Sequence, residues 1–135
     1  VAIQLEDGRI VTGKSSKLMS ACSGAVLNAV KLLSDLSDDI LLLSPIVLAP
    51  IITLKKEVLR EDKIKLNLSD VLTALSICAA TNPVVEKAMD KLKALKDCEA
   101  HSSCILPEGD LSVMRKLGVN VTCEPEFGTK DLYGF

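Results

Sequence analysis

The segment Gly8–Ser15 constrains the fold most, because its residues satisfy two patterns that cannot both form. It reads G-R-I-V-T-G-K-S and matches G-x-x-x-x-G-K-[ST], a loop whose backbone N–H groups bind phosphates. The intervening Arg9–Thr12 contains three β-branched residues and no glycine, and β-branched residues favour extended backbone. The preceding Asp7-Gly8 pair is typical of a β-hairpin turn. We therefore predict strands over residues 1–6 and 9–14, joined by an Asp-Gly turn and leading into a helix, rather than a nucleotide-hydrolysis loop.

Length and composition indicate a single domain with an aliphatic core. A chain of 135 residues is typical of one domain, and we expect residues 1–123 to form it and residues 124–135 to be an irregular tail. All the aromatic residues, 2% of the chain, lie in the last nine positions: Phe127, Tyr133 and Phe135. We expect these rings to dock on the body or on a neighbouring chain. With no other ring to stack a base and a net charge of −2, the sequence argues against nucleic-acid binding.

The sequence also argues against a membrane protein. A spanning helix needs roughly 20 apolar residues, and the longest candidate, residues 40–54, is interrupted by Pro45 and Pro50. No basic segment followed by an apolar run indicates a signal peptide. The five cysteines lack C-x-x-C spacing, which favours free thiols in a reducing cytoplasm. Because Val1 lies within a predicted strand, we expect the chain to be part of a longer protein.

Helices and strands alternate along the rest of the chain. The predicted helices span residues 15–36 (capped by Ser15 or Ser16), residues from 45 into a charged stretch at 55–65 (capped by Ser44, with Pro45 in the first turn), and residues 67–80, 82–95 and 109–117. The predicted strands span residues 40–43, 98–106 and 119–123. We interpret the charged stretch as a solvated surface. The alternation predicts an α/β fold, specifically a mixed-sheet α/β/α sandwich opened by a β-hairpin, with helices on both faces and a cytidine-deaminase-like topology.

The deaminase-like topology allows one chemistry to be tested directly. Zinc deaminases require H-x-E to place a metal ligand and a proton-transfer carboxylate, together with P-C-x-x-C for further ligands. The single histidine, His101, is followed by two serines, and P-C-x-x-C does not occur. The sequence therefore excludes deaminase chemistry.

Two other groups resemble functional sites. Lys14, Ser15 and Ser16 precede a predicted helix, where free N–H groups and the helix dipole attract anions. The same serines also make an ordinary helix cap, which is the favoured interpretation. His101 lies on the predicted strand at 98–106 and could serve a ligand supplied by another domain.

The neighbours of His101 do not complete a metal or catalytic site on a regular strand. Cys98 and Cys104 point to one face and His101 to the other, so we predict no metal site. Glu99 and Ser103 share a face with His101 at a spacing of roughly 7 Å, too far for the direct hydrogen bonds of a catalytic triad. We predict no catalytic residue and no cofactor.

Three segments resemble a known family. They are G-R-I-V-T-G-K-S-S, A-L-S-I-C-A-A-T-N-P at Ala74–Pro83, and the pair C-E-A-H-S-S-C-I-L and R-K-L-G-V-N-V-T-C-E-P within Cys98–Pro125. They resemble the C-terminal domain of the bacterial family called domain of unknown function 1846, or uncharacterised protein family 0371. The resemblance implies a longer cytoplasmic bacterial protein whose N-terminal part is a separate α/β unit. It implies no established reaction, and so no catalytic residue.

These observations lead to two functional hypotheses, and whether the full-length protein is an enzyme stays open. In the first, the chain is a non-catalytic α/β module that packs against the N-terminal domains of its own polypeptide and supports homo-oligomer formation. The apolar helix at 67–80 and the aromatic tail motivate this hypothesis. In the alternative, Lys14, Ser15, Ser16 and His101 supply half of a phosphate or carboxylate site that a missing domain completes.

Overall fold

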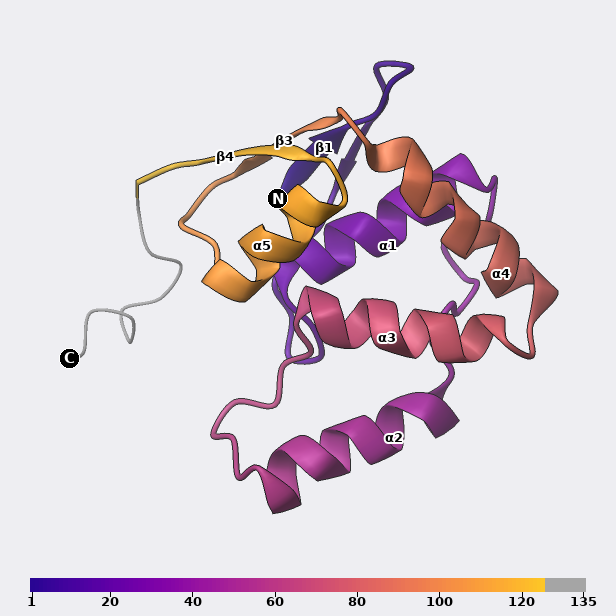
Figure 1. Cartoon of the computed structure of the whole chain (residues 1–135), viewed down its shortest axis with the longest axis vertical. Coiled ribbons are helices and arrows are strands. Elements are labelled where there is room, and N and C mark those ends of the chain that lie inside the picture. Colours follow the sequence, from indigo (N-terminus) through magenta and orange to yellow (C-terminus); the bar gives the residue numbers. More distant parts are fainter. Residues whose placement is uncertain (126–135) are drawn as a thin grey trace.

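A computed structural model describes residues 1–125, which form a four-stranded mixed sheet with helices packed beneath it (Figure 1). The sheet order is β2-β1-β3-β4, with bounds Ala2–Gln4 (β1), Ile10–Thr12 (β2), Glu99–Ser102 (β3) and Asn120–Cys123 (β4). The helices are Ala21–Leu33 (α1), Pro45–Thr53 (α2), Leu68–Ala79 (α3), Pro83–Asp90 (α4) and Glu108–Lys116 (α5), with a π-helical turn at Leu54–Val58 and a 3-10 helix at Lys91–Leu95. The aromatic residues lie outside the described residues, so their predicted docking is not tested.

The predicted N-terminal hairpin is confirmed, with a longer turn than expected. Strands β1 and β2 pair antiparallel, and the Leu5 N–H donates to Arg9 O at 2.8 Å, which leaves three residues in the turn. Only Gly8 takes a positive φ there, at 90°. A two-residue type I′ turn would require positive φ at Asp7 as well, whereas a three-residue loop needs it only at the glycine. The central residues of the phosphate-loop pattern G-x-x-x-x-G-K-[ST] (the P-loop pattern) therefore lie on strand β2, Ile10–Thr12.

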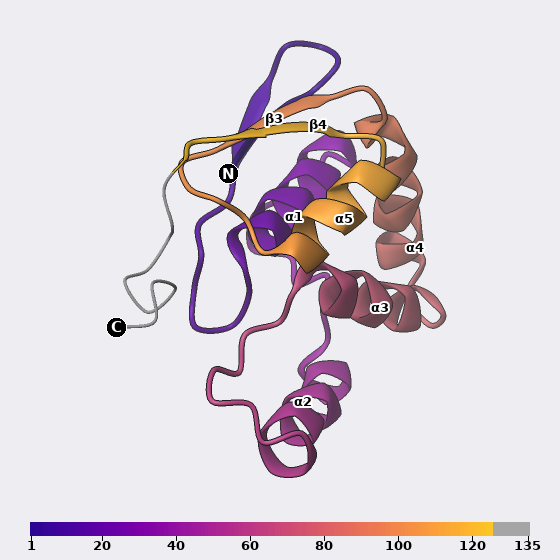
Figure 2. The same ribbon diagram turned by 60° about the vertical axis from the view of Figure 1, so that its left-hand side comes forward.

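Among residues 1–125, the helices all lie on one face of the sheet (Figure 2). Ile3 pairs with both Val11 and Ala100, and these three buried side chains face α1 and α5. Side chains on the other face are mostly exposed, as at Thr12 and His101. The prediction of a three-layer α/β/α sandwich is therefore wrong for this chain, because strand alternation supplies only one apolar face. The α/β class and the mixed sheet are confirmed.

The predicted strand at residues 40–43 does not form. Leu42 and Leu43 are buried, but they pack among the helices as irregular chain that leads into α2. Ser44 caps α2 and Pro45 occupies its first turn, as predicted. A short apolar run indicates burial but does not by itself distinguish a strand from other buried chain. Since the cytidine-deaminase-like topology included this strand, that topology stays unconfirmed.

Helix α1 begins later than the sequence indicates. Its cap is Ser20, whose Oγ accepts the Ser23 N–H at 3.3 Å, so neither Ser15 nor Ser16 caps it. The chain between β2 and α1 is held by close backbone packing instead. A Cβ at Gly13 would lie 2.1 Å from the Ala25 nitrogen. The second glycine of the P-loop pattern is thus required for strand–helix contact.

The core is aliphatic, as predicted, and consists of two clusters. The first lies between the sheet, α1 and α5 and includes Ile3, Val26 and Met114. The second lies among α1 to α4 and includes Leu66 and Leu75. Within residues 1–125, no helix has both the length and the apolar character needed to cross a bilayer.

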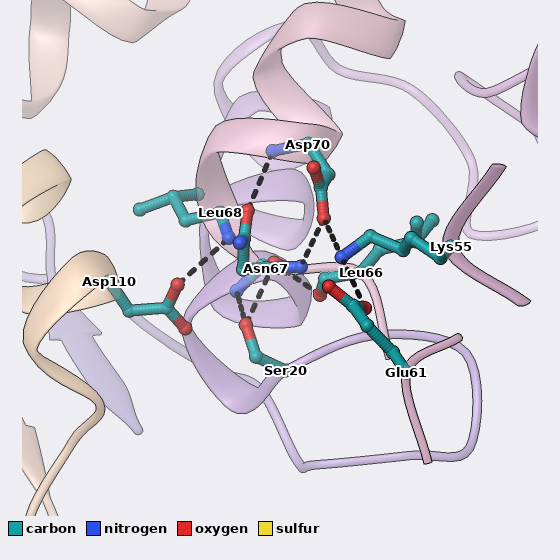
Figure 3. Close-up of polar contacts among 9 residues, drawn as sticks. Ser20, Lys55, Glu61, Leu66, Asn67, Leu68, Asp70 and Asp110 are labelled. Atoms are coloured by element: carbon teal, nitrogen blue, oxygen red, sulfur yellow. Dashed lines mark hydrogen bonds and ion pairs between the residues drawn. The ribbon is translucent and has the colours of Figure 1, made fainter. Parts of the chain in front are cut away.

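The start of α3 is a partly buried polar junction between several elements (Figure 3). Asn67 and Asp70 form a reciprocal capping box, in which each side chain accepts the other residue's N–H. Asp110 of α5, almost fully buried, accepts the Leu68 N–H at 2.9 Å. The carbonyl of Leu66 accepts the N–H of Ser20, which places the α1 and α3 N-termini side by side.

Lys55 connects this junction to the chain after α2. Its ammonium lies 2.9 Å from an Asp70 oxygen and 3.2 Å from a Glu61 oxygen, and its side chain is 10% exposed. The hydrogen bond to Asp70 raises the pKa of Lys55, while burial acts in the opposite direction and Glu61 adds to the increase. The interpretation of residues 55–65 as only a solvated surface is therefore wrong, because Lys55 is a structural ion-pair residue.

We expect Gly13→Ala to lower the free energy of unfolding by at least about 3 kcal/mol, because the new Cβ would clash with helix backbone atoms. The matched control is Gly109→Ala, where no atom lies within 4 Å of the new Cβ. In helix α5 this control should leave stability unchanged or raise it by up to about 1 kcal/mol. Urea unfolding measures both, and equal stability of the two variants would contradict the packing role of Gly13.

We expect Lys55→Met to lower stability at pH 7 by about 1–2 kcal/mol, with exposed Lys56→Met as the control. Because the folded-state pKa is raised above 10.5, the ion pairs contribute fully below that pH and are lost as pH rises through the folded-state value. Wild type should therefore lose more stability than Lys55→Met between neutral and strongly alkaline pH. If chemical denaturation shows that the stability of both proteins changes equally with pH, Lys55 does not have this ion-pair role.

Candidate functional site

A cavity of about 460 Å³ lies between the end of β2, helix α1 and the start of α2. Its volume falls within the range of small-molecule sites. The lining residues are Gly13, Lys14, Ser16, Leu18, Met19, Gly24, Leu27, Asn28, Lys31, Leu41, Leu42, Leu43, Pro45 and Leu48. Two of the predicted site residues, Lys14 and Ser16, are among them, whereas Ser15 and His101 are not.

The polar part of the cavity is cationic. Lys14 and Lys31 line it, and no acidic residue is among the described residues that do so. Lys31 Nζ donates to the Asp38 carbonyl at 3.2 Å, and the Asn28 amide donates to the Thr12 carbonyl at 2.8 Å. Within residues 1–125, Lys14 makes no hydrogen bond or ion pair. An uncompensated pair of lysines favours an anionic group.

The basis for predicting an anion site at Lys14-Ser15-Ser16 is only partly correct. Because α1 begins at Ala21, these residues do not lie at a helix N-terminus. Ser15 Oγ accepts a hydrogen bond from Lys65, and Ser16 Oγ accepts the Leu18 and Met19 N–H groups in a turn. Lys14 can act at this site through its charge, but not together with the helix dipole.

Asn28 and Lys31 were not among the predicted site residues, although their spacing contains a signal. Gly24, Asn28 and Lys31 follow one another at intervals of four and three residues, and they therefore share one face of α1. Leu27 borders the same face and belongs to the apolar wall. Helical periodicity could have grouped these residues, but it could not have shown that residues 14–16 pass beside them.

His101 forms a separate polar group on the exposed face of the sheet. Its Nδ1 lies 2.7 Å from Thr122 Oγ1, and its Nε2 lies 3.0 Å from Glu124 Oε1. Glu99 instead accepts a hydrogen bond from Asn120. The imidazole group is half exposed, and His101 does not line the cavity beside Lys14. The hydroxyl, imidazole and carboxylate are ordered as in a catalytic relay, but they lie on the exposed face of the sheet.

Cys98 and Cys104, the two cysteines near His101, do not come together as metal ligands. Cys98 is buried before β3, while Cys104 lies beyond the end of that strand, which is shorter than predicted. Burial raises the pKa of the Cys98 thiol. Burial, with a smaller effect of the Asp110 charge, raises the pKa of Cys22 to about 12. These thiols behave as core residues and are poor nucleophiles at neutral pH.

Comparison with known proteins identifies the family of this chain. Residues 1–133 match the family described as "Domain of unknown function DUF1846, C-terminal". A UPF0371 protein of Clostridioides difficile (strain 630) is 52% identical over 133 residues, and one of Clostridium botulinum (strain Eklund 17B / Type B) is 49% identical over the same length. Each alignment covers 98% of this chain but 26% of the relative, so the chain spans about a quarter of these proteins. The resemblance seen in the sequence is confirmed: this chain belongs to the DUF1846 C-terminal domain family and corresponds to the C-terminal domain of a larger UPF0371 protein.

Proposed function

We propose that this domain is a non-catalytic module that packs against the N-terminal part of its own polypeptide through the surface of α2. We define the α2 surface by Ile46, Leu54, Val58 and Leu59, four exposed apolar residues on α2 and on the chain that follows it. Ile46 is 84% exposed and Val58 is 68% exposed. Large apolar side chains that gather on one surface typically mark an interface.

The composition and position of α2 carry this proposal. The helix reads P-I-V-L-A-P-I-I-T and has no charged residue; Leu48 is buried, and Val47, Ile51 and Ile52 are only partly buried against the second cluster. Figures 1 and 2 both show α2 as the outermost helix, on the side of α3 away from the sheet. A helix that is apolar on all sides is normally buried in a larger assembly. The helix predicted at 67–80, which with the aromatic tail motivated this hypothesis, is largely used as α3 in this domain's own core.

The length of the relatives supports an occupant from the same polypeptide. About three-quarters of each relative lies outside the region matched by this chain. A second copy of the domain could cover the α2 surface instead. The test below therefore also measures homo-oligomer formation. We also infer a cytoplasmic location, which is supported by the free state of the five cysteines.

The second candidate function is half of a small-molecule site that another domain completes. The cavity beside Lys14 and Ser16 supports it, since it joins two lysines to a concave surface. Ser15 and His101 would contribute only if a ligand or a covering domain extended beyond this cavity. Of the four residues predicted for the small-molecule half-site, Lys14 is therefore the main support.

We expect Ile46→Glu and Val58→Glu to weaken inter-domain packing in the full-length protein, each by about 2 kcal/mol or more if the residue is central to the interface. Hydrogen exchange of α2 peptides should be slow in the full-length protein, faster in both variants, and fast in the isolated domain. The matched control is Ile10→Glu, since Ile10 is also exposed and apolar but lies on β2.

Equal exchange of α2 in the isolated domain and the full-length protein would refute packing at this surface. Sedimentation velocity separates the two occupants. If Ile46→Glu converts an oligomer into a monomer, a second copy covers α2. If the wild type is already a monomer and α2 is protected, the N-terminal part covers it.

A further inference from the structure

We infer that the cavity beside Lys14 binds an amphipathic anion, namely a carboxylate or phosphate group attached to a short alkyl chain. This inference rests on the second candidate function and names its ligand class. It does not depend on the α2 surface, because none of the four residues that define that surface lines the cavity.

The charge of the ligand head follows from the two lysines. Lys14 has no partner within residues 1–125, and Lys31 is anchored by one hydrogen bond to the Asp38 carbonyl. An ammonium group has three hydrogens, so Lys31 keeps two for a ligand. Backbone packing holds the position of Lys14, since Gly13 lies directly against α1. The two cations therefore come from separate elements but line the same cavity.

The alkyl part of the ligand follows from the remaining wall. Residues 41–48 contribute Leu41, Leu42, Leu43, Pro45 and Leu48, and α1 adds Leu27. Leu41 is mostly exposed although it lines the cavity, as an apolar residue at a ligand entrance would be. An inorganic anion would contact only the cationic part and leave this apolar wall against water, at a cost that grows with its area.

The same wall disfavours a nucleotide. No aromatic residue occurs before Phe127, so residues 1–125 offer no ring to stack against a base. The residues of the P-loop pattern do not form a phosphate loop either, since Ile10–Thr12 is strand β2. The cavity combines two positively charged residues with aliphatic side chains, and an anionic group attached to an alkyl chain fits both.

The test is isothermal titration of the full-length protein with four probes: hexyl phosphate, hexanoate, inorganic phosphate and hexanol. We expect hexyl phosphate or hexanoate to bind at least about tenfold more tightly than phosphate and hexanol, and the preferred head group identifies the anion. Lys14→Gln and Lys31→Gln should each weaken that binding about tenfold, the usual effect of losing a charged hydrogen bond. Exposed Lys116→Gln, which changes net charge equally, should leave it unchanged.

Binding of phosphate alone with the same affinity, still dependent on Lys14, would refute the amphipathic ligand and preserve the half-site. Absence of binding by all probes would refute both. A hexanoate probe carrying a diazirine provides a readout independent of the variants. It should label peptides between Leu27 and Leu48, and labelling confined to other peptides would overturn the assignment.

Discussion

The hydrogen bond from the Leu68 N–H to the buried Asp110 carboxylate is the contact on which the arrangement of the helices depends. It fixes α5, which packs under the sheet, against the N-terminus of α3, where a carboxylate also complements the helix dipole. The Leu66 carbonyl joins α1 to the same point through Ser20, and Lys55 joins the chain after α2 through Asp70. One partly buried polar junction thus connects four helices whose other contacts are mostly non-directional and aliphatic.

The candidate cavity is a consequence of this arrangement. Gly13 still pairs with Val1 while it packs directly against α1, and the chain then needs residues 14–20 to reach the start of α1. That connection passes beside Asn28 and Lys31, while the segment leading into α2 supplies the apolar wall. The outward position of α2 leaves Ile46 exposed, together with Leu54, Val58 and Leu59 in the chain that follows the helix. Packing within one domain therefore leaves both a lined cavity and an exposed apolar surface.

Local patterns predicted the elements better than their arrangement. The hairpin, the cap at Ser44 and the aliphatic core follow from short-range chemistry and are confirmed. The prediction of a strand at residues 40–43 was wrong because apolar residues signal burial without specifying strand pairing. The predicted start of α1 was wrong because Ser15, Ser16 and Ser20 can all act as caps, and the hydrogen bond from Ser20 to Leu66 favours Ser20. Long-range contacts decided both cases.

For the candidate site, the sequence by itself predicted that Lys14 follows a strand, and it places every Phe and Tyr of the chain at position 127 or later. It also determined the family, since the distinctive segments extend along most of the chain. The tertiary structure alone brought Lys14 beside Lys31, separated it from His101, and left α2 uncovered. The physical reason is that periodicity and capping are properties of neighbouring residues, whereas shared cavities and exposed faces depend on which distant elements pack together.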